Sequence, residues 1–274
     1  MPYVTTPDNT QLYYKDWGKG RAVVLLHGWP LSADSWEDQA LAFAEAGYRV
    51  IAYDRRGFGR SSQPWDGYDY DTLTDDLASV LKHCKVSEAS LFGFSMGGGE
   101  VARYMSKYSG AGIVQAGLIA SIVPYKLKTP DNPQGTEEKV LDETLAAIKD
   151  DRAKFFAEFF KKFYGVGKTG SAQVSKEVLH ASWNVAMQAG LNATLACANS
   201  FFKTDLRPDL ASFKVPTIVI HGTADENVPI DSSGRPAAKG IKNSTLIEYQ
   251  GSPHGVLATD KRRVTEDLLR FLKG

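Results

Sequence analysis

A serine set between two glycines constrains this chain more than any other feature of its sequence. Ser95 lies between Gly93 and Gly97, after an apolar run at residues 89–94 and before a helical pattern that starts at Gly98. A strand that turns sharply into a helix lifts such a serine clear of a sheet, and small neighbours leave room for the turn. We therefore predict that Ser95 is a nucleophile activated by a base. A glycine-rich turn that only packs a helix against a strand is the structural alternative.

An acid and a histidine follow the serine in the order that this kind of turn requires. Asp225 lies in a loop just past a strand pattern at residues 216–222, and His254 lies in a loop bounded by glycine and proline. We predict that His254 accepts the Ser95 proton and later delivers it to the leaving group. Asp225 would orient the imidazole and stabilise the imidazolium.

The sequence contains other acids and histidines that compete for the same roles. Glu226 is adjacent to Asp225, and a purely turn-forming aspartate is the structural alternative. Asp205 and Asp209 come before the strand and are poorer candidates. Packing or hydrogen bonding is the commoner role for the remaining histidines, which are His27, His83, His180 and His221.

A serine nucleophile also needs donors for the oxyanion of its tetrahedral intermediate. Such donors are commonly the backbone amides of the residue after the nucleophile and of a loop after an earlier strand. Met96 follows Ser95, and Trp29 follows the strand pattern at residues 22–26. Because Pro30 has no amide hydrogen, we predict Trp29 and Met96 as the donors. A simple turn after the strand is the structural alternative.

Composition excludes several classes of function. Hydrophobic residues make up 43% of the 274 residues and charged residues 23%, as in soluble globular proteins. The 32 basic and 32 acidic residues leave no net charge to attract nucleic acid or anionic lipid. No apolar stretch suits a membrane helix or a signal peptide, so we expect a cytoplasmic protein with a neutral small-molecule substrate. The two cysteines, Cys84 and Cys197, lack a paired spacing and are interpreted as small core residues.

Short apolar or β-branched runs alternate with helical patterns, as in a parallel sheet with crossover helices. Residues 11–16 alternate in polarity, and we expect an antiparallel edge strand there. Further strand patterns lie at residues 22–26, 49–53, 89–94, 114–119, 216–222 and 245–249, and helical patterns at residues 35–46, 72–84 and 261–272.

The alternation stops at a loop rich in proline and lysine that begins at Val123. From Glu137 to about Ser200 the apolar spacing is helical and rich in aromatic residues, with no strand pattern. We therefore predict a helical cap at residues 123–205, inserted between two parts of one core at residues 1–122 and 206–274.

These features together resemble the α/β-hydrolase superfamily, and closely the bacterial arylesterases and cofactor-free non-heme chloroperoxidases, also called perhydrolases. The resemblance covers nearly the whole chain. Besides the three loops already described, it rests on residues 27–31, 53–62, 127–129 and 132–133. It implies an α/β-hydrolase fold, with a mostly parallel eight-stranded sheet flanked by helices and a helical cap. It also implies that residues 54–62 form a structural turn without a catalytic role.

The resemblance further implies an activity. Members of this family hydrolyse small aryl and alkyl esters through an acyl-enzyme, and many also pass the acyl group to hydrogen peroxide, which yields a peracid that oxidises halide. No haem, metal or flavin takes part. In related enzymes a proline at the position of Pro30 is linked to perhydrolysis through the preceding carbonyl. Relatives are often homo-oligomers, and the oligomeric state of this chain is left open.

Four residues are candidates for contacts with substrate. Phe159 and Trp183 belong to the aromatic residues of the predicted cap, Phe94 is adjacent to the nucleophile, and Pro30 follows a predicted oxyanion donor. An aromatic stripe on a helix more often belongs to the core, which is the structural alternative for the first two.

Several other activities use the same fold. Epoxide hydrolases and haloalkane dehalogenases have an aspartate nucleophile, which the serine at position 95 disfavours. A lactonase, an amidase or a carbon–carbon bond hydrolase would use the same three residues, because the cap selects the substrate. A ligand receptor built on the fold is the non-enzymatic alternative, and stoichiometric rather than repeated turnover would favour it.

Overall fold

The computed structural model describes residues 2–167 and 174–274, and the strands of these two stretches form one eight-stranded sheet. The strands are β1 (Tyr3–Thr5), β2 (Gln11–Gly18), β3 (Ala22–Leu26), β4 (Arg49–Tyr53), β5 (Ala89–Phe94), β6 (Ile113–Ile119), β7 (Thr217–Gly222) and β8 (Ser244–Tyr249). Their order is β1-β2-β4-β3-β5-β6-β7-β8. Strands β3 to β8 are parallel, and β2 is antiparallel to both of its neighbours. The predicted mostly parallel sheet is confirmed.

The prediction of an edge strand at residues 11–16 was wrong in one respect. Strand β2 is antiparallel, but β1 pairs with its outer side and forms the edge of the sheet. With three residues, β1 is too short to produce a recognisable alternation. Its pairing with β2 could therefore not be read from the sequence.

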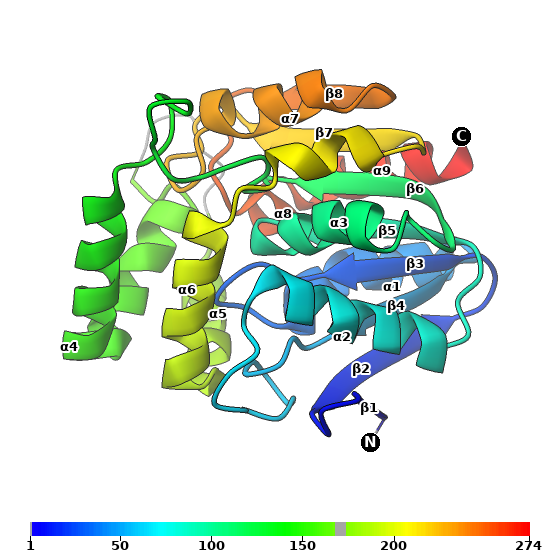
Figure 1. Cartoon of the computed structure of the whole chain (residues 1–274), viewed down its shortest axis with the longest axis horizontal. Coiled ribbons are helices and arrows are strands. Elements are labelled where there is room, and N and C mark those ends of the chain that lie inside the picture. Colours follow the sequence, from blue (N-terminus) through cyan, green and yellow to red (C-terminus); the bar gives the residue numbers. More distant parts are fainter. Residues whose placement is uncertain (1, 168–173) are drawn as a thin grey trace.

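Helices cover both faces of the sheet (Figure 1). On one face lie α2 (Tyr70–His83), α3 (Met96–Lys107) and α7 (Gly234–Gly240). On the other lie α1 (Glu37–Glu45) and α9 (Lys261–Lys273), which follows the short helix α8 (Val256–Thr259). Short 3-10 helices are η1 (Ala33–Trp36), η2 (Arg207–Ser212) and η3 (Ile230–Ser232). Every residue of β3 and β5 is buried, because these central strands are covered on both faces.

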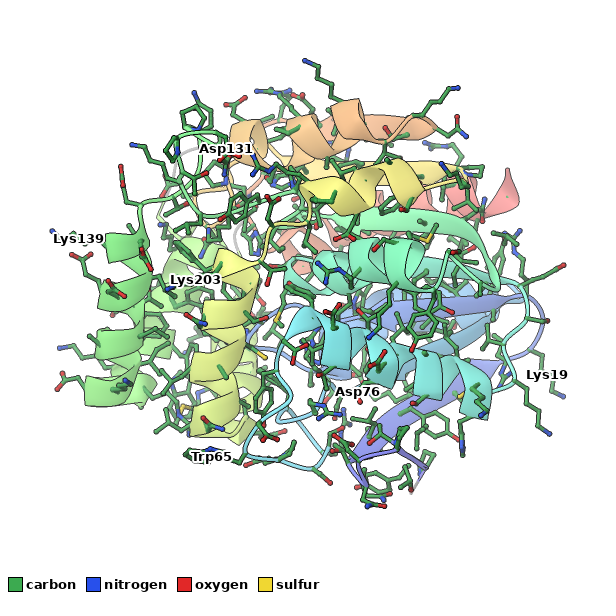
Figure 2. All side chains as sticks on the ribbon, in the orientation of Figure 1. Lys19, Trp65, Asp76, Asp131, Lys139 and Lys203 are labelled. Atoms are coloured by element: carbon green, nitrogen blue, oxygen red, sulfur yellow. The ribbon has the colours of Figure 1, made fainter. Side chains whose placement is uncertain are left out.

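Three helices lie between β6 and β7 and are called the cap helices below: α4 (Glu138–Phe163), α5 (Lys176–Gln188) and α6 (Leu191–Lys203). They lie at one end of the sheet (Figure 1). Helix α4 bends at Asp151. Lys203, labelled in Figure 2, lies at the end of α6. It pairs with Glu138 at the start of α4, at 2.6 Å. All three helices fall within the predicted insertion, and its bounds at residues 123 and 205 stay a prediction.

In the two described stretches, no helix combines the length and the apolar character needed to cross a membrane. Cys84 and Cys197 are buried and carry free thiols, as predicted for core residues.

A buried ion pair holds the segment after β4 against α3. The guanidinium of Arg55 donates to the Glu100 carboxylate, and Tyr53 donates its hydroxyl to the same carboxylate at 2.8 Å. Arg55 and Glu100 are at most 1% exposed. Arg55 also donates to the carbonyl oxygen of His27 at 2.7 Å, so the pair fixes the loop after β3.

A second buried pair lies beside the first. Arg56 donates to the carboxylate of Asp76 on α2 at 2.6 Å (Figure 2). These charges are therefore bound within the protein, which agrees with a structural role for residues 54–62.

Replacing Arg55 by Met should lower the free energy of unfolding by about 3 kcal/mol, because Glu100 would stay buried without its partner. Urea unfolding followed by circular dichroism measures this loss. Arg235→Met is the matched control, since it removes an arginine paired on the surface with Asp231 and Glu248, and its unfolding midpoint should barely change. Equal midpoints for Arg55→Met and the unchanged protein would contradict the importance of the buried pair.

Candidate active site

Ser95 lies in a strained turn between β5 and α3, with φ 52° and ψ −116°. Residues other than glycine rarely adopt positive φ, so the surrounding structure has to hold this one. A Cβ atom on Gly93 would lie 2.4 Å from the carbonyl oxygen of Gly97, and one on Gly97 would lie 2.6 Å from that of Leu26. Only glycine fits at these two positions, which explains the small residues of the motif.

The structure brings Ser95, Asp225 and His254 together. The imidazole Nε2 of His254 lies 2.9 Å from Ser95 Oγ, and its Nδ1 lies 2.6 Å from Asp225 Oδ2. The three residues come from the turn after β5 and from the loops after β7 and β8. Because these strands are parallel, the loops at their carboxyl ends meet at one edge of the sheet.

Asp225 is fully buried and held from several sides. Its Oδ1 accepts hydrogen bonds from the amides of Asn227 at 2.9 Å and Val228 at 2.8 Å, while His221 Nε2 lies 3.3 Å from Oδ2. Burial acts to raise the pKa of Asp225, but His254 and His221 outweigh burial and hold the pKa below its ordinary value. Asp225 is therefore ionised at neutral pH and able to stabilise an imidazolium.

The competing acids lie elsewhere. Glu226 is exposed at the wall of the cavity described below. Asp205 pairs with Arg207 at 2.6 Å, and Asp209 pairs with Arg103 at 3.2 Å.

The competing histidines also have other surroundings. His27 accepts a hydrogen bond from the Arg55 amide at 3.0 Å, and burial holds its pKa well below the usual range, so its ring is neutral. His83 lies 3.3 Å from the Tyr14 hydroxyl, and His180 stacks on Trp183. Among the described hydrogen bonds, none of these three histidines is a partner of Ser95.

Two aromatic rings pack against the imidazole of His254. The ring centroid of Phe94 lies 5.4 Å from that of His254, and the centroid of Phe163 lies 4.8 Å away on α4. The amide of Gly255 donates to the Phe163 carbonyl oxygen at 2.8 Å. Phe94 is thus buried against the histidine ring. Phe163 connects the end of α4 to the loop that contains His254.

Ser95 and His254 open into a cavity of about 810 Å³ between the core and the cap helices. Much of its wall is apolar, with Ile122, Val140, Leu141, Phe155, Phe159, Phe201 and Phe202 as lining residues. A volume and lining of this kind suit a small organic molecule.

Among the predicted substrate contacts, Phe159 lines this cavity, as does Trp29. Phe94, Pro30 and Trp183 are absent from the described part of its wall. Trp183 is directed elsewhere because its indole donates to the carbonyl oxygen of Ala153 at 2.8 Å and its ring stacks on His180.

The predicted oxyanion donors lie on neighbouring segments, since Gly97 at the start of α3 packs against the backbone of Leu26 and His27. Within the described residues, the backbone amides of Trp29 and Met96 donate to no other protein group. The Trp29 indole donates to the Thr194 carbonyl oxygen on α6 at 3.0 Å.

Some features of the site could not be predicted from the sequence. Asn227 and Val228 bind Asp225 through backbone amides, which leave no side-chain signature. Lys126 lines the cavity from the proline- and lysine-rich loop, where no periodicity indicates which side chains point inward. Within the described stretches, no cluster of three or more histidine, cysteine or acidic side chains is arranged to hold a metal ion.

Comparison with known proteins places this geometry in a family. A family model described as alpha/beta hydrolase fold matches residues 21–261. A non-heme chloroperoxidase of Kitasatospora aureofaciens is 40% identical over 274 residues, with 99% of each chain covered. A bifunctional esterase/perhydrolase of Acinetobacter calcoaceticus is 40% identical over 276 residues, with 100% of each chain covered. The crystal structure of a bromoperoxidase from Bacillus anthracis is 43% identical, with a TM-score of 0.96, and covers 100% of this chain and 99% of that one. The chain therefore belongs to the alpha/beta hydrolase fold family, in the group of the non-heme haloperoxidases and related esterases.

Proposed function

We propose that this protein is a serine esterase that hydrolyses small aryl and alkyl carboxylic esters, with Ser95 as nucleophile, His254 as general base and Asp225 as the orienting acid. One observation carries the proposal, the continuous hydrogen-bonded chain from Asp225 through His254 to Ser95 at the wall of a largely apolar cavity. The name of the similar esterase/perhydrolase supports the same chemistry.

The reaction would run in two halves. As Ser95 Oγ attacks the ester carbonyl carbon, His254 Nε2 takes the hydroxyl proton, and the amides of Trp29 and Met96 donate to the new oxyanion. When the intermediate collapses, the leaving alcohol takes that proton from His254 and an acyl-enzyme remains. Water then attacks the acyl carbon, again with His254 as base, and releases the acid and free Ser95.

Hydrogen peroxide can replace water in the second half. His254 would deprotonate the peroxide as it attacks the acyl-enzyme, and the product would be a peracid that oxidises halide in solution. Two similar proteins are named as an esterase/perhydrolase and a non-heme chloroperoxidase, which supports this side activity. Pro30 is buried next to Trp29, the residue whose carbonyl is expected to bind peroxide.

Lactonase, amidase and carbon–carbon bond hydrolase activities would use the same three side chains, and a substrate panel separates them from esterase activity. The cytoplasmic location and any homo-oligomeric assembly stay predictions. A receptor on this fold would react at most once per molecule, so repeated turnover distinguishes the enzyme from it.

Ser95→Ala should lower the turnover of p-nitrophenyl acetate at least about a thousandfold, because the nucleophile that acts together with His254 is removed. Release of p-nitrophenol by both proteins at equal concentration measures the loss. Far-ultraviolet circular dichroism checks that the variant is folded. Equal activity of the two proteins would show that Ser95 is not the nucleophile.

Pro30→Leu should lower perhydrolysis relative to ester hydrolysis, since the proline is expected to set the position of the Trp29 carbonyl that binds peroxide. The ratio is obtained from p-nitrophenol release and from peracid-dependent halogenation in the same preparation. If the ratio is unchanged, Pro30 has no part in the choice between water and peroxide.

A further inference from the structure

Lys126 places a cation in the wall of the cavity that contains Ser95 and His254. It belongs to the loop between β6 and α4 and is partly buried. The other charged side chains of the described wall are exposed; they are Asp150, Asp151, Lys154, Glu158, Lys162 and Glu226. Lys126 is thus the charged side chain of this wall that is most withdrawn from solvent.

The ammonium group of Lys126 has no acidic partner among the described ion pairs. Its Nζ donates to the carbonyl oxygen of Asn227 at 2.7 Å and lies 5.3 Å from the ring centroid of Phe202. An ammonium carries three N–H donors, so the bond to Asn227 leaves two for a ligand. A cation that is partly removed from water and forms no direct ion pair with a carboxylate favours the binding of an anion.

The backbone around Lys126 is fixed before any ligand binds. The Thr136 amide donates to the Lys126 carbonyl oxygen at 2.7 Å. The side-chain amide of Asn132 donates to the carbonyl oxygens of Tyr125 at 3.1 Å and Leu127 at 2.7 Å. Because the loop is already ordered, a ligand that binds Lys126 pays little of the entropic cost of positioning it.

The charge state of Lys126 suits an anion at neutral pH. Burial lowers its pKa to about 8, while Asp225 acts in the opposite direction and Lys162 adds to the lowering. The protonated form therefore predominates at pH 7. The six exposed charged side chains of the wall include more acids than bases. Because water and salt screen them, they affect the approach of a ligand more than its binding.

We propose that Lys126 is a specificity-determining residue that binds a carboxylate on the substrate, so that the preferred esters carry a free carboxylate on one half and an apolar body. This inference rests on the proposed esterase function and names its substrate class. Apolar side chains such as Ile122, Phe159 and Phe202 would contact the body, while the ester carbonyl reaches Ser95.

Two matched pairs of esters test this proposal. The first pair is the p-nitrophenyl monoester of adipic acid and the p-nitrophenyl ester of adipic acid monoamide, which differ in charge on the acyl half. The second pair is p-acetoxybenzoate and p-acetoxybenzamide, which differ in charge on the alcohol half. Wild type should prefer the acid of at least one pair, and that pair identifies the half that faces Lys126.

In Lys126→Met the acid-to-amide ratio of kcat/KM should fall about tenfold for that pair, mainly through KM, because one charge-assisted hydrogen bond is lost. Any loss of activity that the acid and the amide of a pair share cancels in this ratio. Lys126→Arg should keep most of the preference, and Lys162→Met, which removes an exposed cation of the same wall, should leave it intact. The proposal is overturned if Lys126→Met leaves both ratios unchanged, or if Lys162→Met lowers them equally.

Each ratio comes from one preparation, so a partial loss of folded protein does not affect it. If Lys126→Met does not fold, Lys126→Gln replaces it. Binding to Ser95→Ala gives an independent readout. Adipic acid monoamide should raise its melting temperature more than adipamide does, and equal effects would contradict a carboxylate site. Failure of wild type to hydrolyse p-nitrophenyl acetate would count against the esterase proposal alone, since the binding comparison needs no turnover.

Discussion

Crowding of the backbone around Ser95 is the constraint on which the rest of the site depends. The serine has a positive φ, and the chain on either side passes so close to Leu26 and to its own carbonyl groups that Gly93 and Gly97 have no room for a side chain. The strain of such a turn has to be offset by the packing around it. Here that packing comes from β3 and β5, in which every residue is buried, and from the start of α3. The residue with the strained backbone therefore lies next to fully buried strands.

The remaining parts of the site reach Ser95 through contacts that leave little freedom. Asp225 is held by two backbone amides and two histidines, and the ring of His254 packs against Phe94 and Phe163. The Arg55–Glu100 pair fixes the loop that leads to Trp29. Neutral and charged partners thus place the side chains before substrate arrives, which is what electrostatic preorganisation requires.

The sequence was informative where local chemistry dictates structure. Continuous apolar runs predicted the buried parallel strands, and the turn at Ser95 and the loop of Asp225 follow such runs. The loop of His254 follows β8, which is mostly partly exposed. Strand β1 escaped prediction because a three-residue strand is defined by its partner rather than by its own pattern. The catalytic roles of the three residues stay a proposal, although their proximity is now established by geometry.

The cavity wall was harder to predict, because it depends on how the cap helices pack. Helical spacing places Phe159 and Trp183 in a helix but does not say which of them faces the site, and only Phe159 lines the cavity. Lys126 lies in a loop without periodicity, and the zero net charge of the whole chain gave no reason to expect a partly buried cation in the wall of the cavity. Tertiary packing, and not local pattern, decides these positions.

The contact between Phe163 and His254 bears on how such a protein can change its specificity. Phe163 ends α4, yet its ring packs on the histidine and its carbonyl oxygen accepts the Gly255 amide. If the cap helices were exchanged for those of a relative, His254 would lose its contact with Phe163, and the cavity would lose the side chains that the cap helices contribute to its wall. The cap is not an interchangeable module, and a chimaera would need an aromatic residue and a free carbonyl at the point where its last α4 turn meets the histidine loop.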